Sequence, residues 1–257
     1  MDFYTTVEKE LFKLPPSGNP HFLFCFKGQF VNIKSPGEEV LLPKNYACGQ
    51  AVRCIESYHN GIGMLGIMFK PDTFHHLLRE DMQPFTHQPY PIEDVLGNVG
   101  RDLNERLHCT SDYDEMIIYV ENALRKIIPD KRNKSGYLIH NAISLIDRHP
   151  ERSIDEICKE LRSSGRHLRR IFKEKVGIGP KYYLRIKRLH KAASMAFISQ
   201  IKDFQQIVHE CGYYDQSHFG RDIKLFTGKT PLEFFLRESE ASPEKMIHNL
   251  DHLYKME

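Results

Sequence analysis

The chain lacks several features that would place it in common classes of protein. It has no run of 18 apolar residues, and residues 1–13 mix Glu8, Lys9 and Glu10 among their apolar positions, so we expect neither a membrane-spanning helix nor a secretory signal. Its six cysteines include no CxxC pair, which argues against a redox motif or a zinc knuckle. We therefore expect a cytoplasmic protein with reduced, partly buried thiols.

The sets of residues that are typical of catalytic sites are also missing from the sequence. The sequence has no GxxxxGK phosphate loop and no evident Ser/His/Asp or Cys/His set. A metal-dependent cupin enzyme would need several histidines and a carboxylate on adjacent strands, whereas the expected strands offer only His21 and His59. We expect no enzymatic activity, no cofactor and no metal.

The charge of the chain is divided unevenly between its two halves. Residues 131–257 hold 24 Lys and Arg against 16 Asp and Glu, a net +8, whereas residues 1–130 carry a net −6. A local basic excess is expected where only one half meets a polyanion, although a charge run taken alone is more often a solvated face.

The pattern of residues predicts two domains, which a chain of 257 residues is long enough to form. The segment 129–136 is polar, begins with proline and ends with glycine, and is typical of a linker. Before it, short β-branched or aromatic runs at 21–30, 39–42, 51–58 and 62–70 predict an antiparallel sheet, followed by helices from Pro71, over 92–107 and over 112–128. We expect a domain over 1–128, an all-helical domain over 137–238, and a tail helix within 239–257.

The helical half contains an internal repeat at an offset of 50 and then 51 residues. Residues 154, 157, 158 and 161 correspond to 204, 207, 208 and 211, and one extra residue near Gly212 shifts the register. After that shift, residues 164, 168, 170 and 172 correspond to 215, 219, 221 and 223. Two copies of one supersecondary unit are the simplest explanation.

Each copy has the pattern of a helix-turn-helix: a short helix, a tight turn, a capped second helix, then glycine and proline. In this motif the N-terminal end of the second helix enters the major groove of DNA. The second helices are expected over about 164–176 and 215–227, and arginine suits guanine and phosphate whereas glutamine suits adenine. The expected DNA-binding residues are Ser164, Gly165, Arg166, Arg169, Arg170 and Lys173 in the first copy, and Asp215, Gln216, Ser217, Gly220, Arg221 and Lys224 in the second.

A single helix is expected between the copies, because residues 181–198 contain no glycine or proline. Eighteen residues span about 27 Å, which can hold two helices close to one turn of DNA apart, about 34 Å. The expected fold class is α+β: a small antiparallel β domain with following helices, then an all-α domain of two helix-turn-helix units joined by a long helix.

This arrangement resembles the DNA-binding domain of the AraC/XylS family of transcription regulators over about 100 residues. The most specific stretch is 212–231, GYYDQSHFGRDIKLFTGKTP, and residues 166–180 resemble it as well. By position, the resemblance implies base readers at Arg166, Arg169 and Arg170 in the first unit and at Gln216, Ser217 and Arg221 in the second.

The chain departs from the family pattern in its first unit. The usual turn glycine is replaced by Arg162-Ser163, and Cys158 stands where the family usually has alanine. The N-terminal domain, with ACGQ at 47–50 and GIMFKP at 66–71, resembles a small β-rich domain that precedes the DNA-binding pair in some family members.

Several alternatives remain open at this point. The helical half could be a bundle without a nucleic-acid role, or an architectural DNA-binding module with little sequence preference. In the N-terminal domain, aromatic side chains either form the sheet core or line an effector pocket, the pocket candidates being Phe22, Phe24, Phe26, Phe30, Tyr46 and Tyr58. The expected partner is double-stranded DNA; RNA polymerase, a small-molecule effector and a second copy of the chain are further candidates, and no membrane partner is expected.

Overall fold

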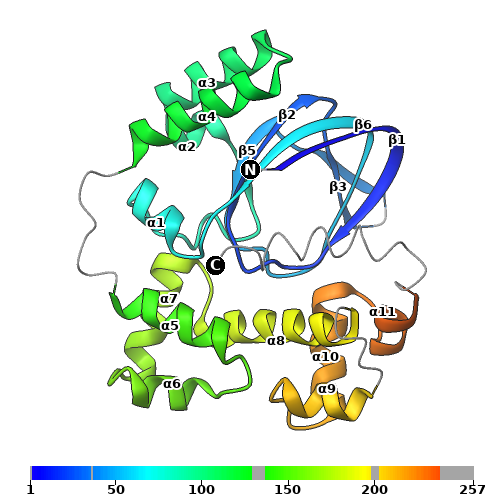
Figure 1. Ribbon diagram of the computed structural model, residues 1–257, viewed down its shortest axis with the longest axis vertical. Helices are drawn as coiled ribbons and strands as arrows, with labels where there is room; N and C mark the ends of the chain where they lie inside the picture. The colour runs from blue at the N-terminus through cyan, green and yellow to red at the C-terminus, as the bar shows by residue number, and fades with distance from the viewer. Residues whose placement is uncertain (1, 36, 129–136, 198–202, 238–257) are drawn as a thin grey trace.

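The computed structural model describes residues 2–35, 37–128, 137–197 and 203–237 and has an α+β architecture (Figure 1). A strongly curved antiparallel sheet with helices forms the N-terminal part, and helices alone form the C-terminal part. This confirms the expected fold class. No helix in these ranges is long and apolar enough to cross a membrane.

The sheet is organised around one long strand, β6 (Ile55–Met68), which pairs antiparallel with β1, β2 and β3. The sheet order is β4-β3-β6-β2-β5-β7, with β1 added on β6. The other strands are β1 (Asp2–Leu14), β2 (His21–Lys27), β3 (Val31–Ser35), β4 (Glu38–Leu41), β5 (Asn45–Cys48) and β7 (Pro89–Pro91).

The strand expectations need correction in several places: β3, β5 and β7 were not expected, and β2 ends at Lys27 and not at residue 30. Residues 51–58 and 62–70 were expected as separate strands, but β6 runs without a break from Ile55 to Met68, with Gly61 at φ 78° inside it. Strand β1 was not expected, because charged residues are interspersed along it; it forms by pairing with β6 from Asp2↔Gly66 to Leu14↔Ile55.

The two faces of the sheet pack into different cores, as the alternation of side chains along a strand requires. Phe22 and Phe24 of β2 point to the face covered by helices and pack with Leu65, Phe74 and Met116. The opposite face holds a smaller cluster of buried residues, namely Cys25, Phe30, Leu42, Tyr46, Cys48 and Ile62.

Four helices accompany the sheet: α1 (Thr73–Leu78), α2 (Ile92–Leu96), α3 (Asn98–Cys109) and α4 (Tyr113–Ile127). A single helix was expected over 92–107, but Gly97 at φ 58° ends α2 and starts α3 in a new direction. Asp112 caps α4 by accepting hydrogen bonds from the amides of Asp114 (2.8 Å) and Glu115 (3.2 Å).

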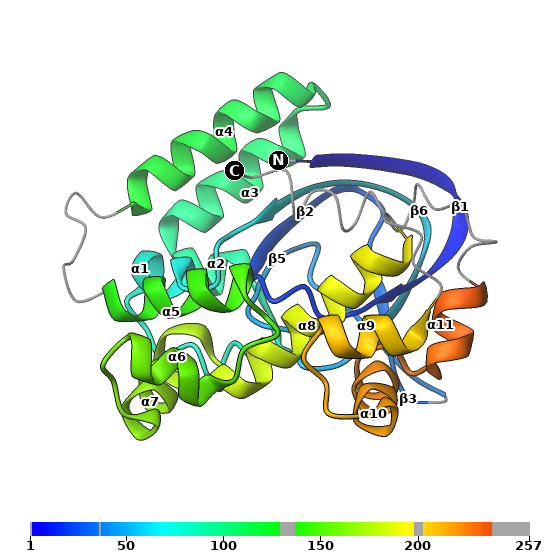
Figure 2. The ribbon, with the colours of Figure 1, turned by 60° about the horizontal axis from the view of Figure 1, so that its bottom comes forward.

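The C-terminal part consists of two similar three-helix groups joined by α8 (Figures 1 and 2). Helix α8 confirms the expected joining helix, and its buried side chains belong to one core shared by both groups. The expected linker at 129–136 and the tail helix within 239–257 lie outside the described residues. The helices are α5 (Tyr137–Arg148), α6 (Ile154–Glu160), α7 (Gly165–Val176), α8 (Pro180–Phe197), α9 (Phe204–Glu210), α10 (Gln216–Thr227) and α11 (Pro231–Arg237).

Candidate DNA-binding surface

The first helix-turn-helix unit is α6 and α7, and both helices begin at a serine cap. Ser153 forms a capping box: its amide donates to the Glu156 carboxylate (2.7 Å), and its hydroxyl accepts from the Glu156 amide (3.2 Å). Ser164 accepts from the amide of His167 (3.2 Å) and starts α7, which ends at Gly177 in the left-handed conformation, φ 90°.

The second unit, α9 and α10, is built in the same way with aspartate caps. The Asp203 carboxylate accepts from the amides of Gln205 (2.8 Å) and Gln206 (3.4 Å) at the start of α9. Asp215 accepts from the amide of His218 (2.6 Å) and starts α10, which ends at Gly228, φ 74°. Ser164 and Asp215 therefore hold the helix ends that the motif directs toward DNA.

The turns of the two units share one hydrogen-bonding pattern, although only the second has the family's glycine. The amides of Arg162 and Gly212 donate to the carbonyls of Lys159 (3.2 Å) and His209 (3.0 Å). The next amide in each turn, that of Ser163 or Tyr213, donates to the carbonyl five residues earlier at 3.0 Å. Arg162 takes the left-handed conformation, φ 50°, that Gly212 takes at φ 70°, at a cost that glycine would avoid.

The outward face of α7 is basic. Leu168, Ile171, Phe172 and Val176 are buried in the core, which turns the opposite side of the helix to solvent. The exposed side chains on that side are Arg166, Arg169, Arg170 and Lys173, while Gly165 is half-buried. Arg170 also donates to the Glu174 carboxylate at 3.3 Å, an exposed contact that leaves the guanidinium accessible.

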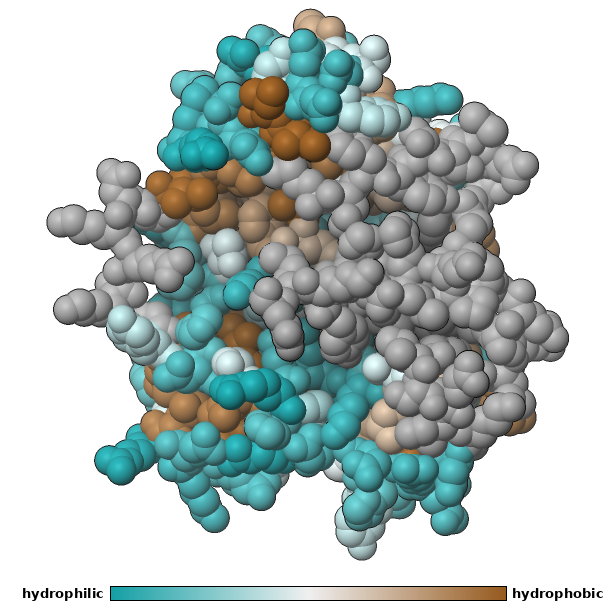
Figure 3. Space-filling view, in the orientation of Figure 1, coloured by the Kyte–Doolittle hydropathy of each residue, from teal (hydrophilic) through white to brown (hydrophobic). Residues whose placement is uncertain are grey.

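The outward face of α10 is polar and carries less charge. Phe219, Ile223 and Phe226 are buried, and Gly220 is half-buried with Pro231 close to it. The exposed side chains near the start of the helix are Gln216, Ser217, Arg221 and Lys224. In Figure 3 the edge of the molecule formed by the helix-turn-helix units is mainly hydrophilic.

Helix α8 holds the two units together through two arginines. Arg188, 9% exposed, donates to the backbone carbonyls of Pro150 (2.8 Å) and Glu151 (3.2 Å), which fixes α8 to the loop before α6. Arg185 forms a bidentate pair with Asp222 of α10, with nitrogen–oxygen distances of 2.6 to 3.0 Å. The side chain of Asp222 is 1% exposed and that of Arg185 26%, so this contact is only partly accessible to water and is screened less by salt than a surface pair.

The N-terminal domain contacts the C-terminal end of α7. The amide of Met82 donates to the carbonyl of Glu174 (2.8 Å), and the Thr86 hydroxyl donates to the carbonyl of Gly177 (3.1 Å). Since these contacts lie at the end of α7 opposite Ser164, they leave the basic N-terminal half of that helix uncovered.

The same domain also packs along α8. The Tyr182 hydroxyl donates to the carbonyl of Val52, and the imidazole of His190 bonds the carbonyl of Pro16 at 2.9 Å. His190 is 4% exposed, and burial lowers its pKa to about 3. Since the ring is then neutral at pH 7, it donates from Nε2 to the carbonyl.

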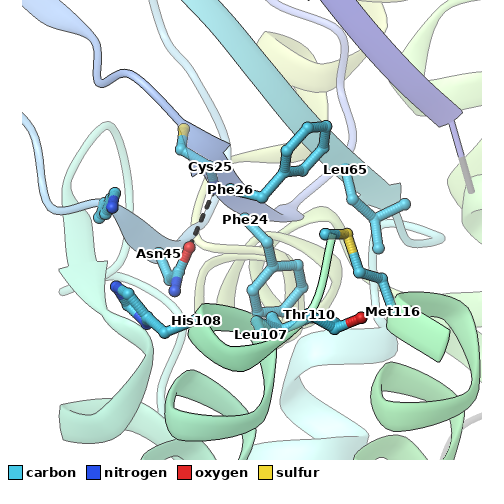
Figure 4. Close-up of a pocket in the computed structure, with 10 residues that line it drawn as sticks. Phe24, Cys25, Phe26, Asn45, Leu65, Leu107, His108, Thr110 and Met116 are labelled. Atoms are coloured by element: carbon cyan, nitrogen blue, oxygen red, sulfur yellow. Dashed lines mark hydrogen bonds between the residues drawn. The ribbon is translucent and has the colours of Figure 1, made fainter. Parts of the chain in front are cut away.

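The aromatic residues suggested as an effector pocket do not surround one cavity. Phe22 and Phe24 are core under the helices, Phe30 and Tyr46 are on the opposite face, and Tyr58 donates to Glu39 at the surface. Only two of the six, Phe24 and Phe26, line the cavity of about 150 Å³ between β2 and the helices α3 and α4 (Figure 4).

That cavity has an apolar side and a polar side. Leu65, Leu107 and Met116 form the apolar part, and Asn45 lies opposite them with its side-chain oxygen accepting from the amide of Cys25 (2.9 Å). A volume of 150 Å³ matches a benzene-sized guest and is smaller than typical ligand sites of roughly 300 Å³ and more. In the described residues, no cluster of three or more His, Cys, Asp or Glu could hold a metal ion.

Two important residues were not found from the sequence. Asp222 is buried on α10, but in the sequence it is simply one more charged residue of an amphipathic helix. Its position opposite Arg185 depends on tertiary packing. Tyr214 is 94% exposed in the turn of the second unit. The repeat did contain a signal for Tyr214, because the register shift requires one extra residue at this turn.

Comparison with known families matches two parts of the chain. Residues 140–237 match a family described as "Helix-turn-helix domain", and residues 2–91 match one described as "Domain of unknown function (DUF6597)". A search of curated proteins found no match.

Among solved structures, ToxT from Vibrio cholerae aligns with 91% of this chain in several crystal forms. An apo form of a ToxT variant gives a TM-score of 0.47 at 15% identity over 95% of its chain, and a further ToxT structure gives 0.45 at 14% over 96%. A third, described as wild-type ToxT with an unsaturated fatty acid bound, gives 0.41 at 16% over 93%.

The helix-turn-helix match spans both units and α8. The C-terminal domain is therefore an AraC-type helix-turn-helix domain, which confirms the resemblance seen in the sequence. This domain is of a DNA-binding, non-enzymatic type that occurs in transcription regulators.

Proposed function

We propose that the chain regulates transcription in the cytoplasm by placing α7 and α10 in successive major grooves on one face of a DNA duplex. The observation that carries the proposal is the pairing of two equally built units at the two ends of α8, an 18-residue helix about 27 Å long. In each unit the second helix is capped at its start and presents exposed polar or basic side chains there.

The contacts divide into two kinds by chemistry. Arg166, Arg169 and Arg170 would bind guanine edges and phosphates, because the planar guanidinium donates two hydrogen bonds at once. Gln216 would read adenine, with Ser217 and Arg221 as further readers in the second unit. The proposal is supported by the burial of every apolar residue between these positions, which leaves them on one face of each helix.

The test is a selection of binding sites from a random DNA library by the full chain. We expect a motif with two half-sites whose centres lie about 10 base pairs apart. A flat profile with measurable binding would instead favour the alternative of an architectural protein with little sequence preference.

We infer a sensing or self-association role for the N-terminal domain. Residues 1–130 carry a net charge of −6, which gives this domain little to gain from contact with DNA. Its contacts with α7 and α8 connect it to the first unit and to the helix that joins the two units. Sedimentation of the full chain and a thermal-shift screen of benzene-sized metabolites test the two roles. If the chain is monomeric and no compound raises its unfolding temperature, neither the self-association role nor the sensing role is supported.

A further inference from the structure

The turn of the second helix-turn-helix unit contains one residue more than the turn of the first. Arg162 and Ser163 make the same backbone hydrogen bonds as Gly212 and Tyr213. The next residue of the first unit is already the helix cap, whereas in the second unit Tyr214 stands before the cap. Tyr214 is therefore the inserted residue, and the first unit has no counterpart to it.

The residues on both sides of Tyr214 are fixed. Tyr213 is 6% exposed, and its ring packs against His218 and Phe219 with centroid distances of 5.3 and 5.2 Å. Asp215 is held as the cap of α10. Gly212 approaches the backbone of Glu151 so closely that a Cβ there would lie 2.3 Å from the carbonyl oxygen. The turn is therefore held on both sides of Tyr214, whose side chain extends into solvent.

The exposure of Tyr214 has no explanation within the fold. With 94% of its surface exposed, Tyr214 is the most exposed large hydrophobic side chain in the described residues. A ring in this position contributes no burial of apolar surface to the stability of the fold. It precedes the end of α10 that the motif directs into the major groove, where the phosphates of the groove edge lie. A tyrosine hydroxyl is among the groups that bind phosphate oxygens.

The charge balance of the second unit also favours an uncharged phosphate contact there. Residues 152–181 hold nine Lys and Arg against four Asp and Glu, whereas residues 202–232 hold four of each. The first unit has a net charge of +5 with which to attract the DNA backbone, whereas the cations of the second unit are balanced by as many carboxylates. A hydroxyl that donates to phosphate supplies a contact without requiring a cation.

We propose that Tyr214 is a DNA-backbone contact of the second unit, with its hydroxyl donating a hydrogen bond to a phosphate at the edge of the groove entered by α10. The inference rests on the proposed function and adds a residue to it. Such a contact positions the helix and strengthens binding to every sequence, and it carries no base preference.

The test uses the full chain, a duplex selected by that chain from a random library, and a scrambled duplex of equal length. Tyr214→Phe removes only the hydroxyl and should weaken binding to both duplexes by a similar factor of roughly three to ten. The slope of log affinity against log salt should stay unchanged, because no cation is lost. Tyr214→Ala should weaken binding at least as much.

Tyr137→Phe is the matched control, because Tyr137 is also exposed, at 67%, and lies at the start of α5, away from α10 (Figure 1). It should bind like the parent, and thermal unfolding should be unchanged in both phenylalanine variants. Parental affinity in Tyr214→Phe would overturn the inference while leaving the proposed function intact. A loss confined to the selected duplex would also overturn it, since the residue would then read bases; failure of the parent to bind any duplex would overturn the proposed function itself.

Discussion

At the scale of single residues, the two recognition helices present different chemistry. Helix α7 offers Arg166, Arg169 and Arg170, which attract any DNA because phosphate contacts carry no sequence information. Helix α10 offers Gln216 and Ser217 at its start, and its one buried charge, Asp222, is paired with Arg185. Affinity and sequence preference should therefore be distributed unequally between the units.

Replacing Arg169 and Arg170 together by alanine should weaken binding to target and scrambled DNA alike. Each phosphate contact contributes about 0.9 to the slope of log affinity against log salt, so the double variant should flatten that slope by roughly one to two units. Titrations of parent and variant at four salt concentrations give the result. Equal slopes would show that the first unit does not dominate the electrostatic contacts.

Gln216→Ala should behave in the opposite manner. It should relax the preference at one base pair of the second half-site by about 1 to 3 kcal/mol, and it should leave the salt slope unchanged because no charge is lost. The measurement is the affinity for duplexes that carry each of the four base pairs at that position. A uniform loss over all four would mean that Gln216 does not read a base.

At the scale of elements, α8 is attached to the second unit by a pair that sequence patterns do not reveal. The Asp222 side chain is 1% exposed and that of Arg185 is 26% exposed. Asp222→Asn should lower the free energy of unfolding by about 1 to 3 kcal/mol, because it leaves a partly buried guanidinium without its counter-charge.

The exposed pair Arg170–Glu174 provides the control for that change. Its side chains are 65% and 40% exposed, so Glu174→Gln should change the stability by no more than about 0.5 kcal/mol. Urea unfolding of both variants and the parent makes the comparison. Equal losses of unfolding free energy in the two variants would show that burial does not make the Arg185–Asp222 pair more stabilising than the exposed pair.

The elements that were predicted well from the sequence are those marked by local patterns, such as the spacing of apolar residues and the capping residues. Helices α7, α8 and α10 follow from apolar spacing together with the caps Ser164 and Asp215, and the structure has them where expected. Strand β1 carries no such signal, because it is stabilised by pairing with the distant β6. The break at Gly97 was missed because a single glycine does not interrupt helical spacing on its own. The effector-pocket residues failed to converge because Phe30 and Tyr46, from other segments of the chain, belong to the core opposite that of Phe22 and Phe24.

At the scale of the whole molecule, the N-terminal domain is joined to the DNA-binding units by contacts that bury a neutral imidazole. His190 of α8 bonds the Pro16 carbonyl, and burial lowers its pKa from 6.5 to about 3. Below pH 6.5 the unfolded chain binds a proton at this ring, whereas the folded protein does not until about pH 3. Stability should therefore fall as the pH is lowered through this window.

His190→Gln tests whether His190 causes this loss of stability, because glutamine can still donate to the Pro16 carbonyl but does not titrate. Between pH 7 and pH 5 the parent should lose about 2 kcal/mol more stability than the variant. His21, whose pKa burial lowers to about 4, titrates in both proteins and cancels from the comparison. Parallel pH profiles of urea unfolding for parent and variant would contradict the assignment of a buried, neutral His190.

The central claim is that α8 fixes two recognition helices at a spacing that matches successive major grooves. The most direct measurement is the affinity of the full chain for the selected duplex after insertion of five base pairs between its half-sites, compared with an insertion of ten. Five base pairs rotate one half-site to the opposite face of the duplex. The affinity should then fall at least tenfold, toward that of one unit alone, and ten base pairs should not restore it because α8 cannot lengthen. An affinity unchanged by both insertions would contradict the claim.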